Sequence, residues 1–183
     1  MINGVDTEAL SETMDAVREE PGLAHVTFGL ESDWIDGCHQ KASTKDLLQN
    51  GEVVETRTAR YTMESDEPAA LLGTDNAASP GEYVLQALAG CYAVTFAANA
   101  AAREIKLDTL RLDMQADFDL HGFLGLDESV RPGAQEIRVD VHATSSNASR
   151  DELRELTELV QQRSPIRDTL AGAVTVTTVL ARD

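Results

Sequence analysis

The residue in this chain that is best suited to chemistry is a cysteine set among small apolar residues. Cys91 lies in the segment Leu88-Ala89-Gly90-Cys91-Tyr92, and the chain has one other cysteine, Cys38. The thiolate form of cysteine is a nucleophile, and the surroundings of the sulfur determine how much thiolate exists. The segment therefore indicates either an inert core thiol or a nucleophile that attacks an electrophilic substrate.

The position of Cys91 determines what it would need in order to react. We expect a helix from about Pro80 to Arg103, with Cys91 about three turns from its start. The helix dipole acts mainly within the first turn, so it does not assist this sulfur. Since burial disfavours the charged form of a thiol, a reactive Cys91 needs a cationic or hydrogen-bonding partner.

Other residue types that carry chemistry form no recognisable site. The four histidines are scattered, and only Cys38 and His39 are adjacent, so we expect no metal centre. The glycines form neither a P-loop nor a dinucleotide fingerprint, so we expect no cofactor. A cysteine-based acyl-transfer enzyme would need a histidine beside Cys91, and no sequence feature nominates one.

The strong negative charge of the chain excludes some classes of partner. It has 32 acidic and 15 basic side chains, which gives a formal net charge of −17. Such a field repels nucleic acid and anionic membranes, and it is typical of a protein adapted to high salt. We find no apolar run of the roughly 18 residues that span a bilayer and no export signal, so we expect a soluble cytoplasmic protein.

The first half of the chain is predicted to contain an appended helix and several short strands. The helix occupies residues 1–22, and residues 23–183 form one domain. Alternating apolar residues from Val26 to Trp34 predict a strand. Asp36-Gly37 and Asn50-Gly51 predict turns, with a further strand over residues 52–64. A polar loop over residues 65–81 then leads into the helix that carries Cys91.

The second half of the chain has the clearest periodicity. Strict alternation from Leu110 to Leu120 predicts a strand, and a second alternating set from Ile137 to Ala143 predicts its antiparallel partner. A capping box over residues 149–152 opens a second helix that ends near Gln162, and Ser164-Pro165 begins a short helical turn. Residues 174–180 predict a final strand. The order predicts an α+β fold, with an antiparallel sheet packed on two helices.

The residues leading to Cys91 resemble a known family. The stretch Ser79-Pro80-Gly81-Glu82-Tyr83-Val84-Leu85-Gln86-Ala87-Leu88-Ala89-Gly90-Cys91 is similar to the signature of the OsmC/Ohr family of osmotically induced and organic hydroperoxide resistance proteins. Asp66-Glu67-Pro68 and Gly73-Thr74-Asp75 resemble its approach loop. The resemblance covers about residues 24–181. It implies an OsmC-like fold, an intertwined homodimer and a thiol peroxidase, in which Cys91 becomes a sulfenic acid that a second cysteine captures.

Two positions depart from the family pattern. Where the family has its resolving cysteine, this chain has Ser164, which cannot form a disulfide. The family carboxylate ten residues before the cysteine falls at Gly81, and Glu82 follows one position later, about 100° further around the helix. Glu82 is therefore our second candidate catalytic residue, as the group that orients an arginine; the alternative is a solvated glutamate at the start of a helix.

The sequence does not determine which groups would activate the Cys91 thiol or capture its sulfenic acid. The candidate arginines are Arg57 and Arg60, which could equally be exposed strand residues. Cys38 could resolve a Cys91 sulfenic acid if the two sulfurs come within disulfide reach. Otherwise a low-molecular-weight thiol or a dithiol protein must act as the reductant.

Two functions are consistent with these residues. The leading hypothesis is a cytoplasmic homodimer that reduces organic hydroperoxides through Cys91 with an external thiol reductant. The alternative is a non-catalytic dimer of the same fold that binds a small apolar molecule, having lost the resolving cysteine at Ser164.

Overall fold

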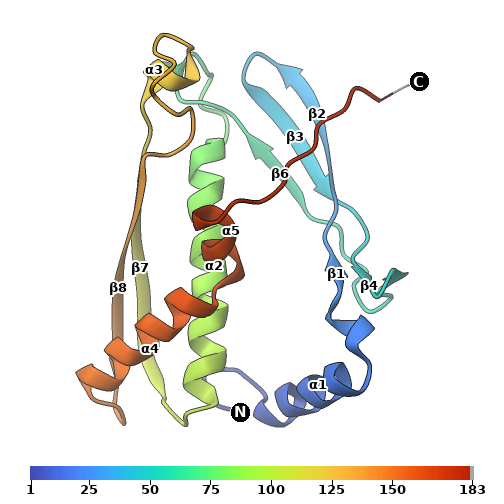
Figure 1. Cartoon of the computed structure of the whole chain (residues 1–183), viewed down its shortest axis with the longest axis vertical. Helices are drawn as coiled ribbons and strands as arrows, with labels where there is room; N and C mark the ends of the chain where they lie inside the picture. Colours follow the sequence, from blue (N-terminus) through green and yellow to red (C-terminus); the bar gives the residue numbers. More distant parts are fainter. Residues whose placement is uncertain (182–183) are drawn as a thin grey trace. The chain divides into compact units, whose positions relative to one another are not determined.

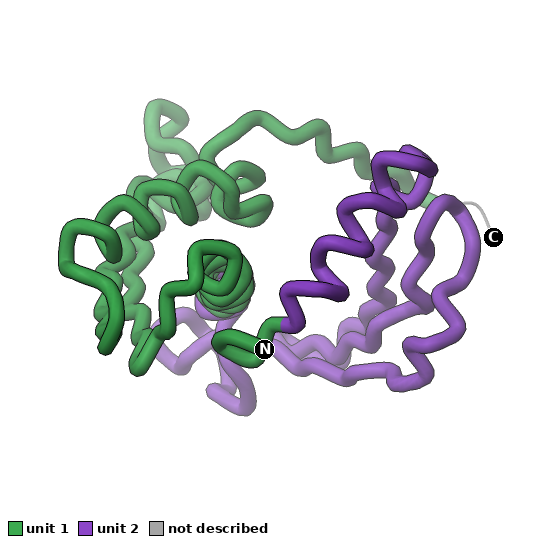
Figure 2. Tube along the Cα trace, turned by 90° about the horizontal axis from the view of Figure 1, so that it is seen from below, with its two compact units in different colours: residues 1–5, 85–183 green, residues 6–84 purple. Residues whose placement is uncertain are grey.

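The structure is a computed structural model, and it describes residues 1–181. The chain divides into two compact units, one formed by residues 1–5 together with residues from 85 onward, the other by residues 6–84 (Figure 2). We call them unit 1 and unit 2. The division predicted from the sequence, an appended helix over 1–22 and one domain over 23–183, stays a prediction.

Unit 1 is built on a pair of long antiparallel strands covered by helices (Figure 1). Apolar side chains from the inner face of the strands pack against a buried cluster on α2 and α4. The predicted antiparallel pairing of the two alternating segments is confirmed. The elements are α2 (Pro80–Ala101), β7 (Leu107–Asp117), α3 (Leu120–Phe123), β8 (Glu136–Ser145), α4 (Arg150–Arg163) and α5 (Pro165–Ala171).

One face of α2 forms the centre of the unit 1 core. The buried side chains Leu88, Tyr92, Phe96 and Ala100 recur every four residues, as one helix face requires. Cys91 precedes Tyr92 by one residue, about 100° around the helix, and is half-buried at the flank of this stripe. Helix α2 is long and apolar enough to cross a bilayer, whereas the sequence analysis expected no such segment. The core helix of a soluble protein has the same length and composition.

Local sequence signals determine where α4 and α5 begin. The Ser149 backbone N–H donates to the Glu152 carboxylate at 2.7 Å, and the Glu152 N–H donates back to Ser149 Oγ at 3.3 Å, which completes the predicted capping box. Ser164 caps α5, and Pro165 occupies the first turn, where a missing N–H costs nothing. The two helices therefore meet at Ser164.

Unit 2 contains a helix followed by two small antiparallel sheets. Asp6 caps the first helix, where its side chain accepts the backbone N–H groups of Glu8 and Ala9. The turn at Asn50-Gly51 is also confirmed, with φ values of 53° and 82° at the two residues. The elements are α1 (Thr7–Glu19), η1 (Pro21–Ala24), β1 (Val26–Thr27), β2 (Leu30–Asp36), β3 (His39–Thr44), β4 (Leu48–Gln49), β5 (Glu52–Val53), β6 (Thr62–Ser65) and η2 (Ala69–Leu71). The sheets are β1-β4-β5 and β2-β3-β6.

Several predicted strands of the first half are shorter than expected. The strand over 26–34 is interrupted after Thr27, and its two parts, β1 and β2, belong to different sheets. The strand over 52–64 is also divided, because a turn closed by Arg57 N–H to Val54 O at 3.1 Å interrupts it. Alternation of side chains does not show where a strand changes its partner.

Two predictions in the second half are wrong for different reasons. Strand β7 ends at Asp117, because the Asp119 side chain accepts the N–H of His121 and starts α3. Residues 174–180 are extended but form no strand within the described residues 1–181, since they pair with no neighbouring strand. Their apolar side chains are exposed, with Leu180 at 98%.

The loop before α2 is folded around one buried carboxylate. Asp66 accepts hydrogen bonds from the backbone N–H groups of Glu67, Thr74 and Asn76 and from the Thr74 hydroxyl, at 2.6–3.2 Å. The Thr74 hydroxyl is the largest of the causes that lower the pKa of Asp66 to about 2. Gly73 is required here, because a Cβ would lie 1.7 Å from the Glu67 carbonyl oxygen. The loop conformation therefore depends on an ionised Asp66.

We predict that Asp66 makes folding stability depend on acid pH. Its pKa is about 2 when folded and about 3.8 when unfolded, so its contribution is present above pH 3.8 and is lost as pH falls through about 2. Asp66→Asn places an amide N–H₂ among N–H donors, so we expect lower stability at pH 7 and a shallower fall between pH 4 and 2. Urea unfolding at several pH values measures both effects.

The exposed Asp33→Asn serves as a control and should retain the wild-type slope. Identical slopes for Asp66→Asn and the wild type would contradict the assignment of this linkage to Asp66.

Candidate functional site

The structure brings Cys91 next to a serine that lies 73 residues later in the chain. Cys91 lies in the middle of α2, and Ser164 lies between α4 and α5. The Ser164 hydroxyl donates a hydrogen bond to Cys91 Sγ, with an Oγ to Sγ distance of 3.1 Å. Ser164 is only 1% exposed. The serine that we expect at the position of the family's second cysteine is therefore in contact with the candidate nucleophile.

The hydrogen bonds of Ser164 direct its hydroxyl proton toward the sulfur. The backbone N–H of Arg167 donates to Ser164 Oγ at 3.3 Å, and the backbone N–H of Ser164 donates to the Val160 carbonyl at 2.9 Å. The oxygen thus accepts a bond from α5, while its proton is available for Cys91. This arrangement follows from the capping role of Ser164.

Two ionisable side chains share the surroundings of Cys91. Tyr92 is buried, and this burial raises the pKa of its hydroxyl, while the positive charge of Arg167 acts in the opposite direction. A thiolate at Cys91 would raise the Tyr92 pKa further. Sequence reasoning missed Arg167, and the only signal was its position in the first turn after Ser164-Pro165. The site therefore combines a thiol with a hydroxyl donor, and the charge of Arg167 acts on the adjacent Tyr92.

The other predicted site residues lie in residues 6–84 and have partners there. The Glu82 carboxylate accepts the Ser79 N–H at 2.7 Å, in a capping box at the start of α2. Arg60 pairs with Asp46 at 3.1 Å, and the Arg57 guanidinium lies 5.6 Å from the centre of the Tyr61 ring. The catalytic role of Glu82 stays a prediction.

Cys38 is exposed in unit 2, where its Sγ lies 3.8 Å from the Leu72 carbonyl oxygen. The two cysteines thus belong to different compact units. Within residues 1–181, no three histidine, cysteine or acidic side chains gather as metal ligands would. The role of Cys38 as a resolving thiol stays a prediction.

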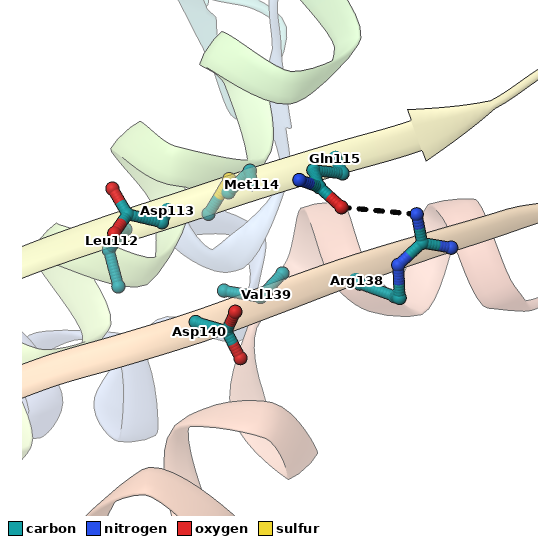
Figure 3. Close-up of a pocket in the computed structure, with 7 residues that line it drawn as sticks. All are labelled: Leu112, Asp113, Met114, Gln115, Arg138, Val139 and Asp140. Atoms are coloured by element: carbon teal, nitrogen blue, oxygen red, sulfur yellow. Dashed lines mark hydrogen bonds between the residues drawn. The ribbon is translucent and has the colours of Figure 1, made fainter.

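A shallow depression on β7 and β8 is formed by a different set of residues (Figure 3). Arg138 lies at one end, where it donates to Gln115 Oε1 at 3.2 Å and also pairs with Glu136 at 2.7 Å. These groups satisfy one another on the polar face of the strands, and none is a strong nucleophile. The lining residues are Leu112, Asp113, Met114, Gln115, Arg138, Val139 and Asp140. Cys91 therefore remains the main candidate for chemistry.

Comparison with known proteins establishes the family. A family model described as OsmC-like protein matches residues 73–179, a range that includes both Cys91 and Ser164. The chain therefore belongs to the OsmC-like family, and the resemblance seen in the sequence is confirmed. No curated protein matches the sequence.

Solved structures confirm the predicted OsmC-like α+β fold. An OsmC-like protein from Mycoplasma pneumoniae is 20% identical with a TM-score of 0.59, and the match covers 80% of this chain and 88% of that one. Organic hydroperoxide resistance proteins from Legionella pneumophila and Elizabethkingia anophelis are 14% and 16% identical, with TM-scores of 0.55 and 0.53. These matches cover 80% of this chain in both cases, and 90% and 89% of the other chains. At such identities the likeness shows the fold.

We predict that Ser164→Cys creates a disulfide with Cys91. The substitution places a second sulfur where the Ser164 hydroxyl now contacts Cys91 Sγ at 3.1 Å, and a small movement would bring the two sulfurs to bonding distance. In a Cys38→Ser background, we expect mild oxidation to remove both thiols and to lower the intact mass by two hydrogen atoms. Mass spectrometry of the unreduced protein measures this change.

The matched control is Ser149→Cys, which alters the other helix-capping serine of unit 1 and should give no such intramolecular bond. If both thiols of Ser164→Cys remain open to alkylation after oxidation, the predicted proximity is wrong.

Proposed function

We propose that this protein reduces organic hydroperoxides in the cytoplasm through Cys91 and takes its electrons from an external thiol. The observation that carries the proposal is the hydrogen bond from Ser164 to the Cys91 sulfur, in a segment that matches the family model. An inert core thiol needs no polar partner, whereas a nucleophilic one does. The hydroperoxide resistance proteins with the same fold support the class of substrate.

The first chemical step oxidises the sulfur. The Cys91 thiolate attacks the terminal oxygen of a hydroperoxide, ROOH, so that a sulfur–oxygen bond forms and the oxygen–oxygen bond breaks. The alkoxide that leaves takes up a proton and becomes the alcohol ROH. Cys91 is then a sulfenic acid, and the hydroperoxide has been reduced by two electrons.

The second step restores the thiol. An external thiol attacks the sulfenic sulfur, water leaves, and a mixed disulfide forms. A second thiol, or the second sulfur of a dithiol protein, then displaces Cys91 and carries away the disulfide. Because Ser164 has no sulfur, the thiol that captures the sulfenic acid in this proposal comes from outside the chain, unless Cys38 provides it. In either case an external thiol supplies the two electrons that restore Cys91.

Glu82 is the second catalytic residue of the proposal. One of its carboxylate oxygens, Oε2, accepts the Ser79 N–H. Its other oxygen, Oε1, accepts no hydrogen bond from residues 1–181, which leaves it able to orient a guanidinium. No cofactor takes part in the proposed reaction.

We predict that Cys91, rather than Cys38, is the nucleophile that the activity requires. Cys91→Ser removes the nucleophile, so hydroperoxide-dependent consumption of dithiothreitol should fall to the background rate, while Cys38→Ser should keep most of it. A coupled assay with cumene hydroperoxide measures the rate, and mass spectrometry locates the oxidised residue. Unchanged consumption in Cys91→Ser would favour the second function, a non-catalytic protein that binds a small apolar molecule.

We also propose that the active form is an intertwined homodimer. The β2-β3-β6 sheet has one charged face, where Lys41 pairs with Glu64 at 2.7 Å, and one face with exposed apolar side chains. Leu30, Trp34 and Tyr61 are 54%, 73% and 58% exposed there. An exposed apolar surface of this kind favours a protein partner. A second copy of the chain could also provide a strand with which the extended residues 174–180 form backbone hydrogen bonds.

We predict that the protein is a dimer in solution and that Trp34→Glu weakens it. A charge on the apolar face would have to be buried on association, which is unfavourable. Sedimentation equilibrium measures the mass of the wild type and the shift of the dissociation constant. Asp33→Ala, on the charged face of the same strand, is the control and should leave assembly unchanged. A monomeric wild type at micromolar concentration would overturn the proposal.

A further inference from the structure

Ser164 has lost the role of a resolving cysteine, but its contacts give it another. We propose that the Ser164 hydroxyl stabilises the thiolate of Cys91 and is thereby a catalytic residue of the reaction. This inference rests on the proposed function and adds a residue to the same site. It assigns to Ser164 the hydrogen-bonding partner that a thiol in the middle of a helix needs.

The geometry fits a donor that acts on the sulfur. The Oγ to Sγ distance of 3.1 Å is short for a hydrogen bond to sulfur, and Ser164 is almost wholly buried. Because the Arg167 N–H already donates to Ser164 Oγ, the hydroxyl is held in one orientation by the start of α5. A donor fixed in this way, in a region of low dielectric constant, interacts more strongly with an anion than a mobile water does.

The described surroundings of this contact include a buried tyrosine and an arginine. Tyr92 follows Cys91 on α2, and the positive charge of Arg167 on α5 acts on Tyr92. Burial raises the Tyr92 pKa, so this side chain stays neutral near pH 7 and does not compete as an anion. Arg167 is half-buried and forms no salt bridge within residues 1–181, and both Arg167 and Cys91 act electrostatically on Tyr92.

The test measures how fast Cys91 is alkylated as a function of pH. In a Cys38→Ser background, iodoacetamide reacts with the Cys91 thiolate, so its rate reports the ionised fraction without any peroxide. For Ser164→Ala we expect a rate about tenfold lower near pH 7, which corresponds to about 1.4 kcal/mol. The difference should vanish at high pH, where the thiol is ionised in both proteins. A merely structural effect would lower the rate equally at every pH.

Three further variants make the result specific. Ser164→Thr keeps a hydroxyl and should restore most of the rate. Ser149→Ala removes the equivalent helix cap of α4 but no contact with sulfur, and should leave the alkylation profile unchanged. Glycine is well tolerated at a helix cap, so Ser164→Gly removes the hydroxyl with little cost to folding. Its alkylation rate should fall as expected for Ser164→Ala, and it tests the same contact if Ser164→Ala folds poorly.

The outcome separates this inference from the function on which it rests. Equal profiles for the wild type, Ser164→Ala and Ser164→Gly, or a rate ratio that does not change with pH, would overturn the role of Ser164. Oxidation of Cys91 by cumene hydroperoxide is followed in parallel with a sulfenic acid probe. If Ser164 controls alkylation but peroxide leaves Cys91 unmodified, the peroxidase function is wrong and the thiolate interaction is retained.

Discussion

The hydrogen bond between Ser164 and Cys91 is the interaction on which the proposed chemistry depends. It joins the middle of α2 to the junction of α4 and α5. The contact forms because α2 and α4 both pack on the inner face of β7 and β8. Leu156 and Val160 place α4 in the core, and Val160 also accepts the backbone N–H of Ser164. The position of the hydroxyl is thus determined by core packing and by helix capping together.

In the proposed function, this arrangement lets a thiol peroxidase work with a serine in place of a second cysteine. A sulfur at position 164 would resolve the sulfenic acid of Cys91, whereas a hydroxyl can only donate a hydrogen bond. In this proposal the resolving thiol lies outside the chain, while the activating contact is retained within it. Arg167 supplies positive charge from the same turn that holds Ser164, so α5 contributes both polar groups of the proposed site.

The two units bury their apolar surface to different degrees. In unit 1, the stripe on α2 and the inner faces of β7 and β8 form a continuous core. In unit 2, by contrast, one face of the β2-β3-β6 sheet exposes Trp34 and Tyr61. The conformation of the loop before α2 is determined there by the hydrogen bonds of Asp66 rather than by an apolar core. This distribution of apolar surface supports the proposed dimer, in which a second copy of the chain would cover the exposed face.

The sequence by itself determined the local elements and the family. The alternation along β7, the capping box at Ser149 and the segment ending at Cys91 are each formed by residues close together in the chain, so their physical effects are local. The sequence could not show that the strand expected over 52–64 is divided between two sheets. Nor could it show that residues 174–180 pair with no other strand within residues 1–181, because strand pairing depends on distant segments. The tertiary structure alone decided that Ser164 touches Cys91 and that Arg167 lies nearby, since packing of α2 against α4 and α5 brings together residues more than 70 positions apart.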